Sequence, residues 1–241
     1  MTSSETKTIS DSRRLVQGVA LAAGVAALGV ASAKPARAVS PALKFSDIPG
    51  TGNVKVLNYA LALEDLESDL YVQALQRLTT GGTNALGTTI TGLGLSTTTD
   101  LDARYIAKYS ATEREHRDFL RAAITAAGAT PITPYKYNFG MESLTRPQVT
   151  ALIYTAEKTG AGAYLGAIKF FADYAYAPIA AAIQGTEARH TATFVIIQNI
   201  LGFTTNLETA PLANENNGID QPIEPDTVLA TVSPFIVVPT Y

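Results

Sequence analysis

The two histidines of this chain stand in the same local pattern, and that pattern constrains the fold more than any other feature. His116 follows Glu113 by three residues, and His190 follows Glu187 by three residues. Residues i and i+3 lie on one face of a helix, so each Glu-x-x-His can direct a carboxylate and an imidazole to one point. Two such helices in a bundle would offer the ligands that transition metals prefer.

Apolar residues at helical spacing predict four long helices in a single domain, residues 54–202. The helices should cover about 54–78, 100–127, 145–174 and 178–201. Asp100 and Thr145 are suitable N-caps for the second and third helices. Residues 79–99 are rich in Gly and Thr and should form a loop, while residues 128–144 should form a crossover. The expected fold class is an all-α, antiparallel four-helix bundle.

Each expected helix places one carboxylate on the apolar stripe that should face the core. A buried carboxylate is costly unless it is paired or bound to a cation, so four in one core need a joint explanation. Together with the two histidines they could hold two divalent metals, with carboxylates as bridges. The predicted metal ligands are Glu64, Glu113, His116, Glu157, Glu187 and His190. Glu67, one step around the first helix, is the alternative to Glu64, and no catalytic residue beyond the ligands is assigned.

A weak internal repeat relates the two halves of the domain. Tyr71 follows Glu64 by seven residues, and Tyr164 follows Glu157 by seven residues. Each Glu-x6-Tyr helix is then followed by a Glu-x-x-His helix, so the chain reads as two helical hairpins related by a pseudo-twofold axis. The two tyrosines should lie two turns from the metals, either as redox neighbours or as ordinary core residues.

Three glycines interrupt the third helix and are expected to have a packing reason. Each costs up to about 1 kcal/mol relative to Ala in a helix interior. Close approach of a neighbouring helix near Glu157 would explain them; they are Gly160, Gly162 and Gly166.

The N-terminal segment has the features of an export signal. Arg13 and Arg14 precede a run of small and apolar residues, 15–33, and Ala36-Arg37-Ala38 fits an A-x-A cleavage site. We expect a twin-arginine signal peptide at residues 1–38 and a periplasmic or extracellular protein. The alternative is an uncleaved segment that anchors the protein in the membrane.

Composition excludes several classes of function. The chain has no cysteine, which rules out disulfides, zinc–thiolate sites and cysteine nucleophiles. Removing residues 1–38 would take five basic and two acidic residues from totals of 18 and 21, leaving a net charge of −6. This charge disfavours binding to nucleic acid or, after cleavage of the signal, to an anionic membrane.

The segments that flank the bundle have distinct compositions. Residues 39–53 should be an extended lead-in. Residues 203–241 should form an extended tail with one short helix, from Asp226 to Val232, and this tail should pack on the bundle because its apolar residues need cover.

The order of helices and candidate ligands resembles the ferritin-like di-iron carboxylate superfamily over about residues 54–201. Within it, the phrases Leu57-Asn58-Tyr59-Ala60-Leu61-Ala62-Leu63-Glu64-Asp65-Leu66-Glu67 and Glu187-Ala188-Arg189-His190 look like the secreted desiccation-related branch, and the tail from Val228 to Phe235 is similar. The resemblance implies an antiparallel bundle with a long crossover between the second and third helices. It implies two metal ions at the six ligands, iron ahead of manganese.

Two interpretations of function follow. In the first, the exported protein handles metal, oxygen or peroxide in stress protection, as a ferroxidase or by peroxide disproportionation, alone or as a homo-oligomer. In the second, it is a non-catalytic secreted stress or desiccation-related protein whose site is empty, with its Glu and His residues paired to one another or to Arg114 and Arg189.

Overall fold

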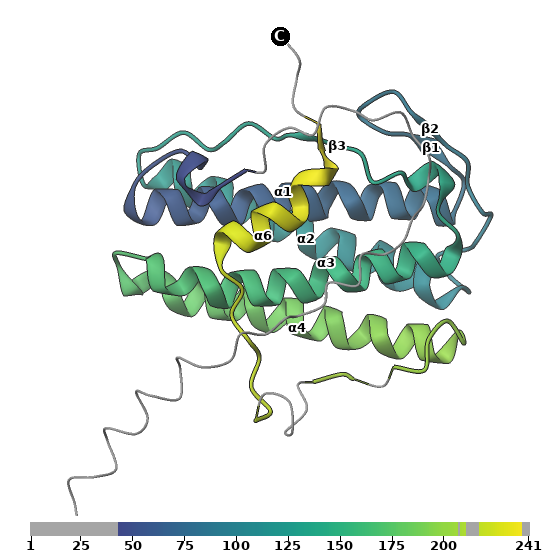
Figure 1. The fold of residues 1–241 in the computed structure, drawn as a ribbon. Coiled ribbons are helices and arrows are strands. Elements are labelled where there is room, and N and C mark those ends of the chain that lie inside the picture. Colours follow the sequence, from purple (N-terminus) through teal and green to yellow (C-terminus); the bar gives the residue numbers. More distant parts are fainter. Residues whose placement is uncertain (1–42, 207, 211–216, 238–241) are drawn as a thin grey trace, which may run out of the picture. The chain divides into compact units, whose positions relative to one another are not determined.

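The structure is a computed structural model that describes residues 43–206, 208–210 and 217–237. The expected signal peptide, residues 1–38, lies outside the described residues. Four long helices form the bundle (Figure 1): α1 (Gly52–Leu78), α2 (Leu101–Ala126), α3 (Arg146–Ala167) and α4 (Ala177–Ile200). The helices α1 and α2 pack as one antiparallel hairpin, and α3 and α4 as a second, with a long crossover between α2 and α3. The all-α bundle expected from the sequence is confirmed.

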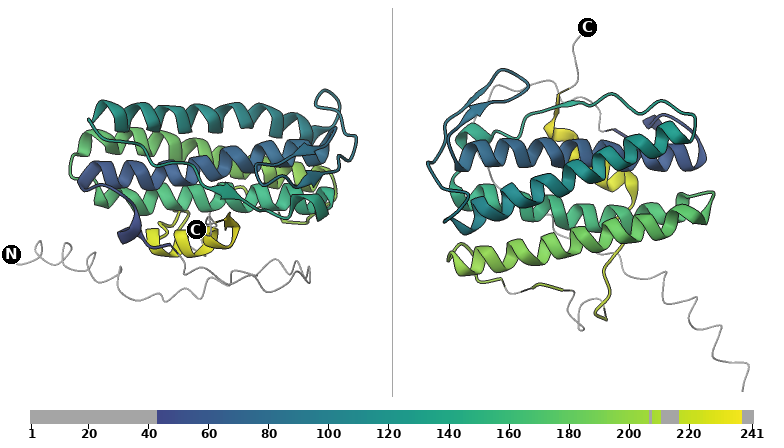
Figure 2. Two further views of the ribbon diagram at one scale, coloured as in Figure 1. Left: turned by 90° about the horizontal axis from the view of Figure 1, so that it is seen from above. Right: turned by 180° about the vertical axis from the view of Figure 1, so that it is seen from behind.

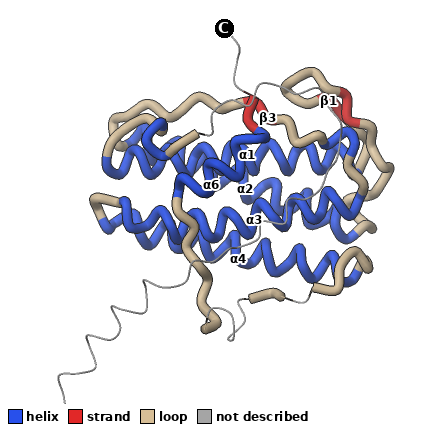
Figure 3. Tube along the Cα trace, in the orientation of Figure 1, coloured by secondary structure: helices blue, strands red, loops and turns tan. Residues whose placement is uncertain are grey.

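Short helices and strands lie in the segments that connect or flank the four long helices (Figure 3). Strands β1 and β2 pair antiparallel within residues 79–99, where the sequence analysis expected only a loop. Strand β3, in the crossover, pairs antiparallel with β4, close to the end of the described chain. The bounds are η1 (Phe45–Asp47), β1 (Gly82–Thr83), β2 (Thr89–Ile90), β3 (Lys136–Tyr137), η2 (Met141–Ser143), η3 (Ile168–Phe170), η4 (Tyr174–Tyr176), α6 (Pro225–Val232), η5 (Ser233–Phe235) and β4 (Ile236–Val237).

The third helix is shorter than its apolar pattern predicts. It ends at Ala167 and not near Tyr174, and a single 3₁₀ turn follows. Phe171 then adopts an extended backbone. The next two backbone N–H groups, of Ala172 and Asp173, donate to the side-chain Oδ1 of Asn53 at 2.8 and 3.0 Å. These bonds to α1 take the place of helical hydrogen bonds, and α3 therefore ends here. The apolar residues at helical spacing continue beyond this point, which is why the sequence predicted a longer helix.

Helix α1 is the most enclosed element of the bundle. Its residues are buried on nearly every face between Val56 and Tyr71, and not only along the expected stripe. The helix α6 lies on the outer side of α1 and α3, opposite α2 and α4 (Figure 2). A helix that is apolar on most of its surface must be packed against other elements on most of its surface. Here the flanking segments cover the part of α1 that the other long helices leave open.

Two of the three glycines in α3 make room for the C-terminal segment and not for a neighbouring helix. The backbone N–H of Ile223 donates to the carbonyl oxygen of Gly162 at 2.9 Å. A Cβ on Gly166 would lie 1.9 Å from the carbonyl oxygen of Ile223, which no side chain could tolerate. The expectation of close helix–helix approach is therefore wrong for these two, and it applies only to Gly160, which faces side chains of α1 and α4.

Candidate metal centre

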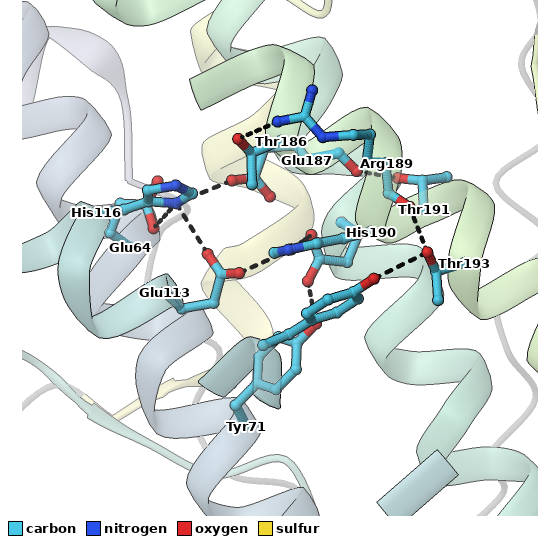
Figure 4. Close-up of polar contacts among 12 residues, drawn as sticks. Glu64, Tyr71, Glu113, His116, Thr186, Glu187, Arg189, His190, Thr191 and Thr193 are labelled. Atoms are coloured by element: carbon cyan, nitrogen blue, oxygen red, sulfur yellow. Dashed lines mark hydrogen bonds and ion pairs between the residues drawn. The ribbon is translucent and has the colours of Figure 1, made fainter. Parts of the chain in front are cut away.

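All six predicted ligands converge in the bundle. Figure 4 labels all of them except Glu157. They form two overlapping groups, and within each group one ligand atom per residue lies within 4.8 Å of every other. Glu113 and Glu187 belong to both groups. The first group is Glu64, Glu113, His116 and Glu187; the second is Glu113, Glu157, Glu187 and His190. Two carboxylates shared between two such groups is the arrangement that bridging ligands require.

Glu113 lies between the two imidazoles, as Figure 4 shows. Its Oε2 is 3.2 Å from Nδ1 of His116, and its Oε1 is 2.9 Å from Nδ1 of His190. The same nitrogen of His116 is 3.3 Å from Oε1 of Glu187 and 3.6 Å from Oε2 of Glu64. Both histidines therefore point Nδ1 toward the carboxylates.

Tyr71 and Tyr164 contact the candidate ligands directly. The Tyr71 hydroxyl, on α1, donates to Oε1 of Glu157 on α3, and Oε2 of Glu157 is 3.2 Å from Nδ1 of His190. The Tyr164 hydroxyl, on α3, donates to Oε1 of Glu64 on α1. Each tyrosine thus donates a hydrogen bond to a glutamate of the opposite hairpin. Each tyrosine was expected to lie two turns from the metals. Each instead contacts a candidate ligand on a helix of the opposite hairpin.

Several carboxylate oxygens at the centre have no hydrogen bond of suitable geometry from any residue that the structure describes. They are fully buried, and an unpaired buried polar atom typically costs about 1–3 kcal/mol. Some lie near an imidazole nitrogen, but at an unsuitable angle. These atoms are Glu64 Oε2, Glu113 Oε1 and both oxygens of Glu187. Buried carboxylate oxygens that face one another without hydrogen-bond donors are what a metal site needs, so these residues fit a bound cation.

Burial and mutual repulsion change the acidity of the cluster. Burial raises the pKa of Glu64 to about 8, although the nearby imidazole of His116 acts to lower it. Burial, and then repulsion by nearby carboxylates, raise the pKa of Glu157 and Glu187 well above the ordinary value. Protons would therefore neutralise part of the cluster wherever no metal does.

The pKa values of Glu113 and His116 shift in the directions expected for an ion pair. Burial would lower the pKa of His116, but the nearby carboxylates of Glu113, Glu187 and Glu64 raise it to about 12. Burial would raise the pKa of Glu113, but its bonds to both histidines bring it below the ordinary value. Glu113 and His116 are thus the charged pair at the centre of the cluster.

Glu67 is buried beside the cluster but belongs to neither ligand group. Burial, followed by repulsion from Glu187 and Glu64, raises its pKa well above the ordinary value. Its carboxylate occupies space that Gly160 leaves open, since a Cβ on Gly160 would lie 3.1 Å from Oε1 of Glu67 and 3.3 Å from Oε2 of Glu187. Of the two alternatives on α1, the structure places Glu64 among the ligand groups.

Tyr109 also contacts the cluster, although it was not among the predicted site residues. Its ring stacks on the imidazole of His190, with centroids 3.8 Å apart and an interplanar angle of 19°. Its hydroxyl lies 3.0 Å from Oγ1 of Thr193, which uses its own hydrogen to donate to the carbonyl oxygen of Arg189. Tyr109 therefore donates to Thr193. The sequence did carry a signal for this contact, because Tyr109 stands four residues before Glu113 and so lies on the same helical face.

Arg114 and Arg189 do not pair with the cluster within the described part of the chain. Arg114 donates to Oγ of Ser110 at 2.8 Å, and Arg189 donates to Oγ1 of Thr186 at 2.9 Å. The pairing of cluster carboxylates with these arginines, which the metal-free interpretation allowed, is therefore wrong. The pairing of glutamates with histidines is present, as the distances above show.

Comparison with known proteins gives one family. A family model described as a ferritin-like domain matches residues 52–201, which include the whole bundle and all six candidate ligands. No curated protein matches the chain. The helix order, the position of the Glu/His cluster and this match agree, and the chain belongs to the ferritin-like domain family.

Proposed function

We propose that this protein holds two divalent metal ions, iron or manganese, and uses them to react with oxygen or peroxide. The observation that carries the proposal is the pair of overlapping ligand groups that share Glu113 and Glu187. Each group combines three carboxylates with one imidazole, a donor set that suits iron and manganese.

Charge balance supports two ions. The four glutamates would carry a charge of −4 when ionised, which two divalent cations neutralise while both histidines stay neutral. Binding would displace the protons that burial retains on Glu64, Glu157 and Glu187. Bound iron or manganese would supply one-electron redox chemistry toward oxygen species.

The protein's own residues would fix the ligands and exclude water. Tyr71 and Tyr164 orient one oxygen each of Glu157 and Glu64, and the other oxygen of each faces an imidazole at the centre. Tyr109 holds the ring plane of His190. Outer contacts of this kind typically set ligand geometry and tune metal affinity.

Two reactions need no external reductant. One is oxidation of ferrous ions by oxygen or peroxide, and the other is disproportionation of peroxide at a dimanganese centre. Since the chain has no cysteine, electron supply through a cysteine-bound iron is excluded. Either reaction would suit a role in stress protection, and metal or peroxide would be the partner.

Metal analysis tests the proposal directly. Protein expressed with iron or manganese should contain about two ions per chain, and the double variant Glu113→Ala/His190→Ala should contain fewer than one. Asp118→Ala is the matched control, because Asp118 is an exposed acid on the same helix as Glu113. A folded wild-type protein that takes up no metal under supplementation would contradict the proposal. Peroxide consumption by the loaded protein would then separate an enzyme from a metal binder.

Export through the twin-arginine route belongs to the same proposal. It rests on Arg13, Arg14 and the A-x-A site, all outside the described residues. Within the described residues, no helix has the length and apolar character needed to span a membrane. Mass spectrometry of the native protein should find a new N-terminus near residue 39. The double variant Arg13→Lys/Arg14→Lys should stay unprocessed, and normal processing of that variant would contradict this route.

A further inference from the structure

One face of the metal centre opens to a cleft between α2 and α4. The cleft has a volume of about 450 Å³, within the range of small-molecule binding sites. Its walls come only from these two helices, and His116 is one of the lining residues. The others are Glu115, Phe119, Pro178, Ile179, Ala182, Ile183 and Thr186.

His116 is the one candidate ligand with appreciable access to solvent. Its side chain is 13% exposed, whereas those of the four glutamates are fully buried and that of His190 is 4% exposed. The cleft is therefore a route by which a molecule outside the bundle could reach a candidate ligand.

The chemistry of the walls selects against a hydrated cation. Five of the eight lining residues are apolar, and Phe119 and Ile179 are 44% and 38% exposed there despite their size. Glu115 is the single carboxylate of the walls. A cation that keeps its water would need more oxygen ligands along its path, because shedding water without replacement is costly.

A second apolar space adjoins the cleft. Ile179 and Ile183 line both the cleft and a small, partly enclosed apolar void whose walls also include Leu63, Leu120 and Tyr164. The void itself has room for little more than one water-sized sphere, about 20 Å³. Apolar voids of this kind stay dry, so the inner wall of the cleft favours hydrocarbon over water.

We infer that the cleft binds the apolar body of an alkyl or aryl hydroperoxide, with its peroxide group directed past His116 to the metal centre. This inference rests on the proposed function and names its substrate class. The O–O bond of the hydroperoxide breaks to give an alcohol and one water. Two ferrous ions supply one electron each and become ferric, and two protons come from solvent. Mostly apolar walls and one polar end at His116 are the features that favour an organic hydroperoxide over hydrogen peroxide.

A binding experiment on the metal-free protein tests the cleft without reference to metal. Because the chain has only two histidines, ¹⁵N-histidine labelling gives one set of imidazole signals for each. The unreactive alcohol 2-phenyl-2-propanol should shift the His116 signals saturably and leave those of His190 nearly unchanged. Ala182→Trp should abolish the shift by filling the cleft, while Ala181→Trp, at an exposed neighbour outside the cleft, should retain it.

Phe119→Gln provides a second variant with little risk to folding, because Phe119 is largely exposed. It keeps the cleft open but makes one wall polar, and it should weaken binding of the alcohol. No saturable shift in the wild-type protein, or an equal shift in Ala182→Trp, overturns the inference. Dimerisation that depends on this face and occurs without an alcohol-induced shift would also overturn it, because the cleft would then be an interface.

A rate comparison tests the substrate class. In the ferrous-loaded protein, Ala182→Trp should slow oxidation by cumene hydroperoxide by about tenfold or more while changing oxidation by hydrogen peroxide by less than about threefold. Equal slowing of both would show an entrance without selectivity and contradict the inference. If the alcohol binds but the protein takes up no metal, the proposed function fails and the binding site stands. If metal binds and the alcohol does not, the inference about the cleft fails and the proposed function stands.

Discussion

The hydroxyl of Tyr71 donates a hydrogen bond to Glu157, which lies on the facing hairpin 86 residues further along the chain. Tyr164 repeats the relationship in the opposite direction with Glu64. The internal repeat of the sequence therefore appears in space as a reciprocal exchange. Each hairpin orients the carboxylate of the other, so neither half of the centre is complete on its own.

Tyr71→Phe should lower the stability of the metal-free protein by about 1–3 kcal/mol, because Glu157 would lose a buried donor. Thermal or urea unfolding measures the change. Tyr59→Phe is the matched control, since Tyr59 is also on α1 and fully buried but its hydroxyl has no hydrogen-bond partner among the described residues. Equal losses in the two variants would show that the Tyr71 hydroxyl bond contributes nothing specific.

Gly160→Ala should weaken metal binding by about tenfold or more. The added Cβ would lie 3.1 Å from Glu67 and 3.3 Å from Glu187, so one carboxylate must move. Gly185→Ala on α4 is the control, because its Cβ would meet only the end of the Arg189 side chain at 3.6 Å. The control should bind metal normally and gain about 0.5–1 kcal/mol of stability. Competition with a chelator measures both affinities, and unchanged affinity in Gly160→Ala would count against the close fit at this position.

The stability of the metal-free protein should fall as pH rises from about 5 to about 9. The folded state raises the pKa of Glu64 from 4.5 to about 8, so it binds more protons than the unfolded state in that window and loses stability as pH rises. The folded state also raises the pKa of His116 from 6.5 to about 12, and the stabilisation, complete below pH 6.5, is lost as pH rises above it.

Metal binding should show the opposite dependence. Because ions displace protons from the carboxylates, metal affinity should increase with pH over the same range. Calorimetric unfolding of both forms at several pH values gives the two slopes. A metal-free melting temperature that increases from pH 5 to pH 9 would mean that the Glu64–His116 contact does not hold the proton in the folded state.

Replacing Tyr109 should disturb His190 in graded steps. Tyr109→Phe keeps the stacked ring and loses only the bond to Thr193, so metal affinity should change by less than about threefold. Tyr109→Ala also removes the stack and should lower affinity by about tenfold. The imidazole signals of His190 should broaden only in the second variant, and equal behaviour of the two would assign the effect to the hydroxyl.

The arrangement of the four helices could be predicted because their apolar residues repeat at helical spacing, with Asp100 and Thr145 at two of the starts. Thr145 forms a capping box with Gln148, as its sequence position suggests. The convergence of the six Glu and His residues could be predicted for a related reason, since each lies on the core-facing side of its helix. Local periodicity carries both kinds of information.

Features that depend on contacts between distant segments could not be predicted from the sequence. The end of α3 depends on the side chain of Asn53, more than 110 residues earlier. The role of Gly166 depends on the path of Ile223. The stack of Tyr109 on His190 depends on the relative rotation of α2 and α4. Each of these is set by tertiary packing, which helical periodicity does not encode.

The beginning and end of the described chain are hydrogen-bonded to each other. The backbone N–H of Leu43 donates to Oγ of Ser233 at 3.0 Å, and that of Phe45 donates to Oδ1 of Asp226 at 2.7 Å. These partners are made about 180–190 residues apart during synthesis. The segment just after the expected signal can therefore reach its native contacts only once Asp226 and Ser233 have been synthesised. If the chain is exported by a transporter that accepts folded cargo, these contacts between distant segments would form before export, and the leading segment would cross the membrane already bonded to residues 226–233.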